Sequence, residues 1–149
     1  MESQSLKEPC SSCGLRLFHC ICDLMSPIHN QTPVWVIRHH KERNKASNTG
    51  GVLTRVLQKA RLIPYADPEH PLQTASLQGE NRVLIFPNAS PISDQIPSHP
   101  TLILLDGTWV QVRKMYHRIP GLAGLPHLSL PPPSLRPRMR QTPHEGGMS

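Results

Sequence analysis

The chain has 149 residues, which is the usual size of one domain and enough to bury an ordinary hydrophobic core. Sixteen lysines and arginines against ten acidic residues give a formal net charge of +6, which favours a polyanionic partner such as a nucleic acid, although such a charge also serves solubility. The sequence holds neither a run of about eighteen apolar residues nor a charged-then-apolar leader, so we expect a soluble, cytoplasmic protein without a membrane span or a secretory signal.

All four cysteines fall in one short segment near the amino terminus. They form a Cys-x-x-Cys pair and a Cys-x-Cys pair, namely Cys10, Cys13, Cys20 and Cys22. A reducing compartment keeps cysteine thiols from forming disulfides, so a zinc site with four thiolate ligands is a better account than a disulfide framework. The alternatives are that the cysteines are small buried side chains or a redox pair, or that His19 replaces one of them as a ligand. We expect a disordered segment over residues 1–9 and a zinc knuckle over residues 10–30.

Strand and helix patterns alternate after the cysteines. The apolar run at residues 34–37 predicts a first strand that leads to His39 and His40. Asn48 or Thr49 is placed to cap a helix whose apolar side chains recur three and four residues apart, which indicates one buried face. Those apolar side chains are Leu53, Val56, Leu57 and Ala60.

Further strands are predicted in the second half of the chain. Residues 82–86 form the second strand, which stops at Pro87, and the aliphatic run at residues 102–105 forms the third. Residues 127–130 could add a short strand. Strands that alternate with helices imply an α/β fold with a largely parallel sheet.

The third strand leads directly into a carboxylate at the start of a helix. Asp106 follows the strand, Gly107 permits a tight turn, and Thr108 can cap a helix predicted to run to about Arg118. Ligands of open α/β sheets collect beyond the carboxyl ends of such strands, so Asp106 is a candidate catalyst. The competing interpretation is structural, because an aspartate before a helix is more often a cap.

One string resembles the signature of a known family: Leu104-Leu105-Asp106-Gly107-Thr108-Trp109, with Arg113-Lys114-Met115 after it. The DTW-domain family is named for such an Asp-x-Thr-Trp motif and contains tRNA-uridine aminocarboxypropyltransferases. The other matching stretches are the cysteine cluster, residues 39–50 with Glu42 and the string Ser47-Asn48-Thr49-Gly50, residues 85–87 with Ala89, and residues 126–130. The resemblance therefore implies a DTW domain over residues 31–149, with a knuckle whose role is structural or RNA-facing.

The sequence departs from the family pattern at two places. Gly51 stands where family members often have an arginine after the asparagine-threonine-glycine triplet, and this exchange would remove a contact to an anion. Residues 143–149 resemble the lead-in to the serine-threonine-x-glutamate-alanine motif and stop at its first residue. We therefore expect the carboxyl-terminal end of the domain to be missing, its knot to be incomplete, and this form to be weak or inactive.

The resemblance implies a SPOUT-like fold and a transfer of the 3-amino-3-carboxypropyl group from S-adenosylmethionine to N3 of a tRNA uridine. Asp106 is then the candidate general base or, alternatively, a ligand of the donor's ammonium group. Thr108 offers a hydroxyl at a helix amino terminus, and Trp109 either stacks on a base or belongs to the core. The expected co-substrate-binding residues are Asn48, Thr49, Gly50, Phe86, Pro87, Leu105, Gly107 and Leu130, of which Asn48 and Thr49 have the alternative role of plain helix caps.

The expected partner is tRNA, and no obligate protein partner is evident. Basic side chains beside the first loop and in the tail would position the tRNA backbone without selecting a base. They are Arg38, His40, Lys41, Arg136, Arg138 and Arg140. The alternative function is a non-catalytic zinc-containing RNA-binding module, and a zinc-stabilised interaction protein without a nucleic-acid role ranks last.

Overall fold

A computed structural model describes residues 8–43, 45, 49–66, 77, 79–87 and 96–129 of the chain. Several residues predicted above to bind co-substrate or RNA lie outside the described residues: Asn48, Leu130, Arg136, Arg138 and Arg140. The resemblance places the knot of a SPOUT-like fold in the loops after Phe86, after Asp106 and around residues 125–130, and these loops fall partly outside the described residues, at residues 88–95 and 130.

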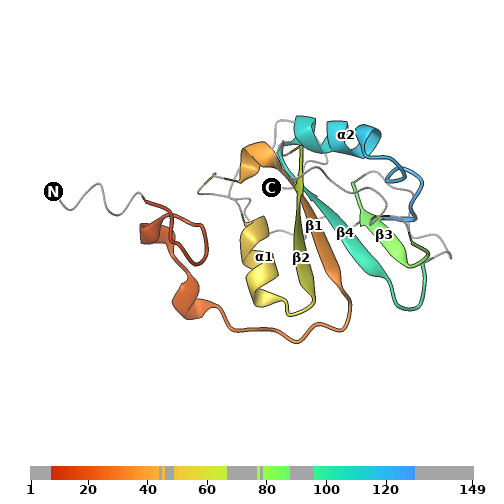
Figure 1. The fold of residues 1–149 in the computed structure, drawn as a ribbon. Coiled ribbons are helices and arrows are strands. Elements are labelled where there is room, and N and C mark those ends of the chain that lie inside the picture. Colours follow the sequence, from red (N-terminus) through yellow and green to blue (C-terminus); the bar gives the residue numbers. More distant parts are fainter. Residues whose placement is uncertain are drawn as a thin grey trace, which may run out of the picture.

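Five parallel strands form one sheet in the order β2-β1-β4-β3-β5 (Figure 1). The strands are β1 (Val34–His39), β2 (Ala60–Tyr65), β3 (Arg82–Ile85), β4 (Thr101–Asp106) and β5 (His127–Leu128). The α/β fold with a parallel sheet, predicted from the alternation of patterns, is confirmed. All five strands point the same way, so their carboxyl ends share one edge, where α/β proteins place their ligands.

Among the described residues, two α-helices flank this sheet. They are α1 (Gly50–Val56), between β1 and β2, and α2 (Trp109–Arg118), directly after β4; short 3-10 turns cover Leu17–His19, Cys22–Leu24 and His40–Glu42. Side chains alternate along a strand, so Ile37 faces α2 whereas Arg38 faces α1. The two helices therefore cover opposite faces of β1. None of the helices in the described part of the chain is long and apolar enough to span a membrane.

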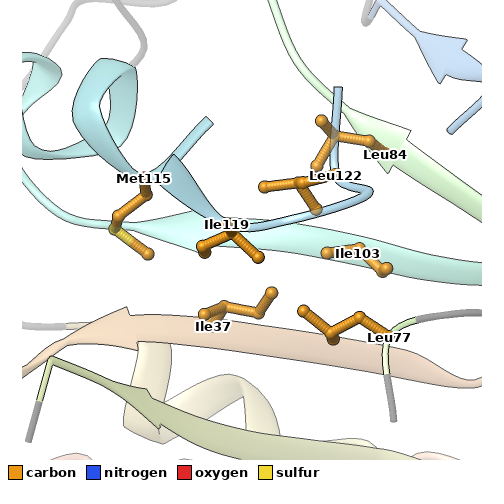
Figure 2. Packing of buried hydrophobic residues seen from close by; sticks show 7 residues of the cluster. All are labelled: Ile37, Leu77, Leu84, Ile103, Met115, Ile119 and Leu122. Carbon is orange, nitrogen blue, oxygen red and sulfur yellow. The ribbon is translucent and has the colours of Figure 1, made fainter. Parts of the chain in front are cut away.

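The main hydrophobic core lies between α2 with the turn after it and one face of the sheet. Figure 2 shows its buried side chains: Ile37, Leu77, Leu84, Ile103, Met115, Ile119 and Leu122. Met115 and Ile103 are fully buried, and each such aliphatic side chain contributes about 1.5–3 kcal/mol through removal from water. This packing fixes α2 against β4 and so fixes the segment that joins them.

The prediction of a helix that includes Leu57 and Ala60 was wrong. Leu57 ends α1, and Ala60 is the first residue of β2, a strand that the sequence analysis missed. The backbone explains the difference, because the N–H of Gln58 donates to the carbonyl oxygen of Ile28 and the following residues pair with β1. A parallel partner strand satisfies these backbone groups, whereas a helix of this length alone is marginal.

The other predicted boundaries differ by one or two residues. The first strand continues from Ile37 to His39, the second ends at Ile85 and leaves Phe86 just beyond the sheet, and the last is limited to β5. These shifts lie within the usual fraying of element ends.

Candidate functional site

The four cysteine sulfurs gather at one point on the amino-terminal segment. The Sγ atoms of Cys10, Cys13, Cys20 and Cys22 all lie within 4.8 Å of one another. The shortest separations are 3.5 Å between Cys20 and Cys10, 3.7 Å between Cys10 and Cys22, and 3.8 Å between Cys13 and Cys20. A tetrahedral zinc ion with bonds of about 2.3 Å would hold its sulfurs about 3.8 Å apart. This donor set could therefore hold a metal ion.

The local backbone builds this cluster from tight turns. The N–H of Gly14 donates to the carbonyl oxygen of Cys10, and Gly14 adopts a φ of +74°, which glycine accommodates without a steric penalty. The second pair lies between two short turns, in which the N–H of Cys20 donates to the carbonyl oxygen of Leu17 and the N–H of Met25 donates to that of Cys22.

The acidities of the thiols show why a cation suits this cluster. The pKa of Cys10 falls to about 6 because the backbone N–H groups of Cys13 and Ser12 stabilise its thiolate. The pKa of Cys20 rises to about 12, although the backbone of Cys22 favours its thiolate, because the neighbouring thiols of Cys22 and Cys10 oppose a further negative charge there. The thiolate of Cys10 therefore forms readily whereas that of Cys20 is opposed by its neighbours, and a bound divalent cation would stabilise thiolates at both residues.

The cysteine cluster lies beside α1 (Figure 1). Arg55, in the last turn of α1, donates to the hydroxyl of Ser12 over 3.4 Å, and Ile28 forms a parallel bridge with Leu57. These contacts tie the segment to the helix rather than to the carboxyl ends of the strands. His19, the alternative ligand, is exposed and its ring packs 4.0 Å from that of Phe18.

The second candidate site is the carboxyl edge of the sheet at the end of β4. Asp106 is the last residue of the strand, and Thr108 is the N-cap of α2. The hydroxyl oxygen of Thr108 accepts from the N–H of Gln111 over 3.4 Å, while Gln111 Oε1 accepts from the N–H of Thr108 over 2.7 Å. This reciprocal capping box confirms the predicted cap and holds the first turn of α2 in place.

Gly107 allows a close approach between this turn and its neighbours. A Cβ at residue 107 would lie 3.1 Å from Gln111 Oε1 and 3.6 Å from the Cβ of His39. The backbone at residue 107 therefore lies close to His39 of β1, so His39 stands beside the turn that follows Asp106.

Arg38 is the neighbour of Asp106 within the sheet. The two residues pair in register across β1 and β4, and both are half-buried. The Arg38 side chain extends toward α1, where its Nη1 atom would lie 3.7 Å from a Cβ at Gly51. Burial lowers the pKa of the Arg38 guanidinium, and the charge of Asp106 opposes that shift. A guanidinium thus occupies the space beside residue 51, where the family pattern has an arginine and this chain has glycine.

His39 is the last residue of β1, and its side chain lies on the opposite face of the strand from that of Arg38. Its Nδ1 atom accepts the N–H of Lys41 over 3.2 Å, and its ring lies 5.9 Å from that of Tyr65. Burial lowers the pKa of His39, and the positive charges of His40 and Lys41 act in the same direction. The sequence analysis did not single out His39 as a site residue, although its place at a strand end was available as a signal.

A stack of aromatic rings borders the edge beyond β4. The ring of Phe86 lies 4.6 Å from Tyr116 and 5.9 Å from Trp109, in both cases nearly parallel, and Tyr116 meets His127 edge-on at 5.6 Å. Trp109 is half-buried and therefore contributes one ring face to this packing. The buried Nε2 of His127 has no hydrogen-bond partner among the described residues.

The nine described residues expected to act on the co-substrate all lie at the ends of β3 and β4 or in the segments that follow β1, β3 and β4. They are Thr49, Gly50, Phe86, Pro87, Leu105, Asp106, Gly107, Thr108 and Trp109. Thr49 stands at the N-cap position of α1 but makes no side-chain capping bond there. Of the residues expected to bind RNA, Lys41 is exposed and His40 is half-buried just beyond β1, whereas Arg38 is half-buried in β1 and extends toward α1.

Comparisons with known proteins agree on one family. A family model described as the DTW domain matches residues 7–149, a span that includes the cysteine cluster. The chain is similar to tRNA-uridine aminocarboxypropyltransferase 2 of Macaca fascicularis, with 22% identity over 131 residues that cover 79% of this chain and 44% of the relative. The chain thus spans less than half the length of that relative. No solved structure matches the chain significantly.

Proposed function

Because the chain belongs to the DTW domain family, we propose that it transfers the 3-amino-3-carboxypropyl group of S-adenosylmethionine to N3 of a uridine in tRNA. The observation that carries the proposal is the position of Asp106, which ends a central parallel strand immediately before a capped helix. This is where an α/β sheet presents groups to a ligand. The name of the similar macaque protein supports the choice of reaction.

The reaction needs a base, an aligned donor and a leaving group. The N3–H bond breaks as a base takes the proton, N3 forms a bond to the side-chain carbon on the sulfonium, and the carbon–sulfur bond breaks. Its electron pair stays on sulfur, and neutral methylthioadenosine leaves. Holding both reactants in line supplies a large share of the rate, because a two-molecule reaction becomes effectively a one-molecule reaction.

Asp106 is the proposed base or, alternatively, the ligand of the donor's ammonium group. Its carboxylate is half-buried at the end of β4. The capping box keeps Thr108 and the backbone after Asp106 in a fixed geometry, while the hydroxyl hydrogen of Thr108 remains able to donate to a ligand. A preformed turn of this kind limits the reorganisation needed when the reactants bind.

The aromatic stack is proposed as the wall of the adenosine or uridine site. Phe86 and Trp109 belong to the segments that follow β3 and β4, so both reach the same edge as Asp106. Planar rings prefer offset stacking on other π-systems. Pro87, Leu105 and Gly107 would provide the backbone and apolar contacts beside them.

The cysteine cluster is proposed to hold one structural zinc ion. The thiol spacing matches a tetrahedral site with four cysteine ligands, and four protein ligands leave no open position for a substrate water. Zinc would fix the fold of the knuckle, while the chemistry belongs to the carboxyl edge of the sheet.

Contacts to the tRNA backbone are proposed for exposed basic side chains. Lys41 lies on the loop after β1, beside the edge that carries Asp106, and Arg136, Arg138 and Arg140 belong to the carboxyl-terminal segment. Specific RNA recognition usually splays a base out of a loop or bulge, which would bring a uridine to Asp106.

Product analysis with and without tRNA tests the proposal. The chain is incubated with S-adenosylmethionine, and the nucleoside products are separated by liquid chromatography. We expect methylthioadenosine to appear only when tRNA is present. Formation of S-adenosylhomocysteine instead would identify a methyltransferase, and RNA binding without any donor cleavage would favour the non-catalytic RNA-binding alternative.

A further inference from the structure

We propose that Arg38 binds the carboxylate of the donor's amino-acid group and thereby selects a donor that carries both a carboxylate and an ammonium group. The inference rests on the proposed function, since it names the part of S-adenosylmethionine that one side of the same site recognises. It assigns to Arg38 a donor-binding role in place of the tRNA-backbone contact expected from the sequence.

The position of Arg38 is the first argument. Arg38 pairs in register with Asp106 on the adjacent strand, and the two side chains carry opposite charges. An α-amino acid group carries its carboxylate and its ammonium on the same carbon atom. A guanidinium and a carboxylate on neighbouring strands are therefore complementary to that group. Arg38 would face the carboxylate, and Asp106 would face the ammonium in the second of the two roles given for it above.

The surroundings of the guanidinium are the second argument. The side chain runs toward the first turn of α1, where residue 51 is glycine. A Cβ added to Gly51 would lie 3.7 Å from Nη1 of Arg38. No side chain at residue 51 covers the guanidinium on that side. Arginine presents a planar fork of N–H donors that fits a carboxylate with two parallel hydrogen bonds.

Arg38 is more buried than the other cationic side chains of the same region. Lys41 and Arg43 are exposed, as suits contacts to a solvated phosphate backbone, whereas Arg38 is half-buried at the end of a central strand. A partly desolvated cation gains more from a bound anion than a fully solvated one does. A small anionic group that enters the edge therefore suits Arg38 better than a phosphate on the surface of a large RNA.

The test measures binding of three nucleosides to the chain by isothermal titration calorimetry. They are S-adenosylmethionine, its decarboxylated analogue, which keeps the sulfonium and the amine, and methylthioadenosine, which lacks the whole amino-acid group. For the unchanged chain we expect S-adenosylmethionine to bind about 10- to 100-fold more tightly than the decarboxylated analogue, as for other charge-assisted hydrogen bonds.

Variants then assign that preference to one side chain. Arg38→Gln should remove the preference and leave the affinity for methylthioadenosine unchanged, and Arg38→Lys should retain part of it because the charge remains while the fork is lost. Arg118→Gln, an exposed change in the last turn of α2, is the matched control and should bind all three nucleosides as the unchanged chain does.

The outcomes separate this inference from the proposed function. If the unchanged chain binds the two sulfonium compounds equally, or if Arg38→Gln weakens methylthioadenosine as much as S-adenosylmethionine, the role of Arg38 is overturned while the proposed function stands. If Arg38→Gln weakens tRNA binding alone, Arg38 is an RNA contact and the inference fails. If the unchanged chain binds none of the three nucleosides, both the proposed function and this inference are contradicted.

Discussion

Thr108 and Gln111 bond to each other twice across the first turn of α2, each side chain accepting the backbone N–H of the other. This reciprocal cap satisfies two N–H groups that a helix start would otherwise leave without partners. It also fixes the chain directly after Asp106, so the stability of the helix and the geometry of the candidate site depend on the same pair.

Thr108→Ala should lower the free energy of unfolding by about 1 kcal/mol, because it removes the oxygen that accepts from Gln111. Denaturant unfolding followed by circular dichroism measures the change. Thr108→Ser keeps the hydroxyl and is the control, so it should remain close to the unchanged chain. An equal loss in both variants would show that the methyl group matters rather than the cap.

Gly51→Ala should raise the free energy of unfolding by about 0.5–1 kcal/mol, because alanine restricts the unfolded chain and favours a helix. The added Cβ would lie 3.7 Å from Arg38 Nη1, which is an ordinary contact. Gly14→Ala provides the contrast: a Cβ there meets nothing within 4 Å, but φ is +74°, so that change should destabilise. Thermal unfolding of both variants checks the pair, and a destabilised Gly51→Ala would mean that α1 does not tolerate a side chain beside Arg38.

Chain purified without chelator should contain about one zinc ion, and Cys10→Ser combined with Cys13→Ser should abolish it. Metal analysis by mass spectrometry decides the matter. Because the ligands lie in one short segment, metal loss should unfold the knuckle more than the sheet, which amide hydrogen exchange resolves. Zinc that persists in the double variant, or a folded knuckle without metal, would contradict the assignment.

Binding to tRNA should weaken steeply with salt, since phosphate contacts release counterions. Replacement of three arginines in the carboxyl-terminal segment by alanine should flatten this dependence for all tRNAs alike. They are Arg136, Arg138 and Arg140. Filter binding over a range of salt concentrations measures the slope. A slope that stays the same would mean that this segment makes no phosphate contacts.

The sequence was sufficient for the parts of the fold that local patterns determine. The run before Asp106 predicted β4, and the order of Gly107 and Thr108 predicted the turn and the cap, because these features depend on residues close together in the chain. The cysteine spacing likewise predicted that four thiols meet at one point.

Features that depend on distant partners were missed. The strand β2 owes its existence to pairing with β1, and its Pro64 is tolerated because β2 lies at the edge of the sheet. The pairing of Arg38 with Asp106 depends on the register of two strands that are far apart in sequence, so spacing along the chain could not reveal it. The same holds for the ring of Phe86 on Tyr116.

The most direct test of the central claim is mass spectrometry of tRNA nucleosides after incubation of the chain with S-adenosylmethionine, carried out in parallel with Asp106→Asn. In line with the weak activity expected from the sequence, we expect slow formation of aminocarboxypropyluridine by the unchanged chain. Formation by the variant should be about 10²- to 10⁴-fold slower still, because a neutral amide keeps the shape but can neither take the N3 proton nor pair with an ammonium group. Circular dichroism should show that the variant remains folded. Modified uridine at an undiminished rate in Asp106→Asn would exclude Asp106 from both roles, and methyluridine from the unchanged chain would contradict the proposed reaction.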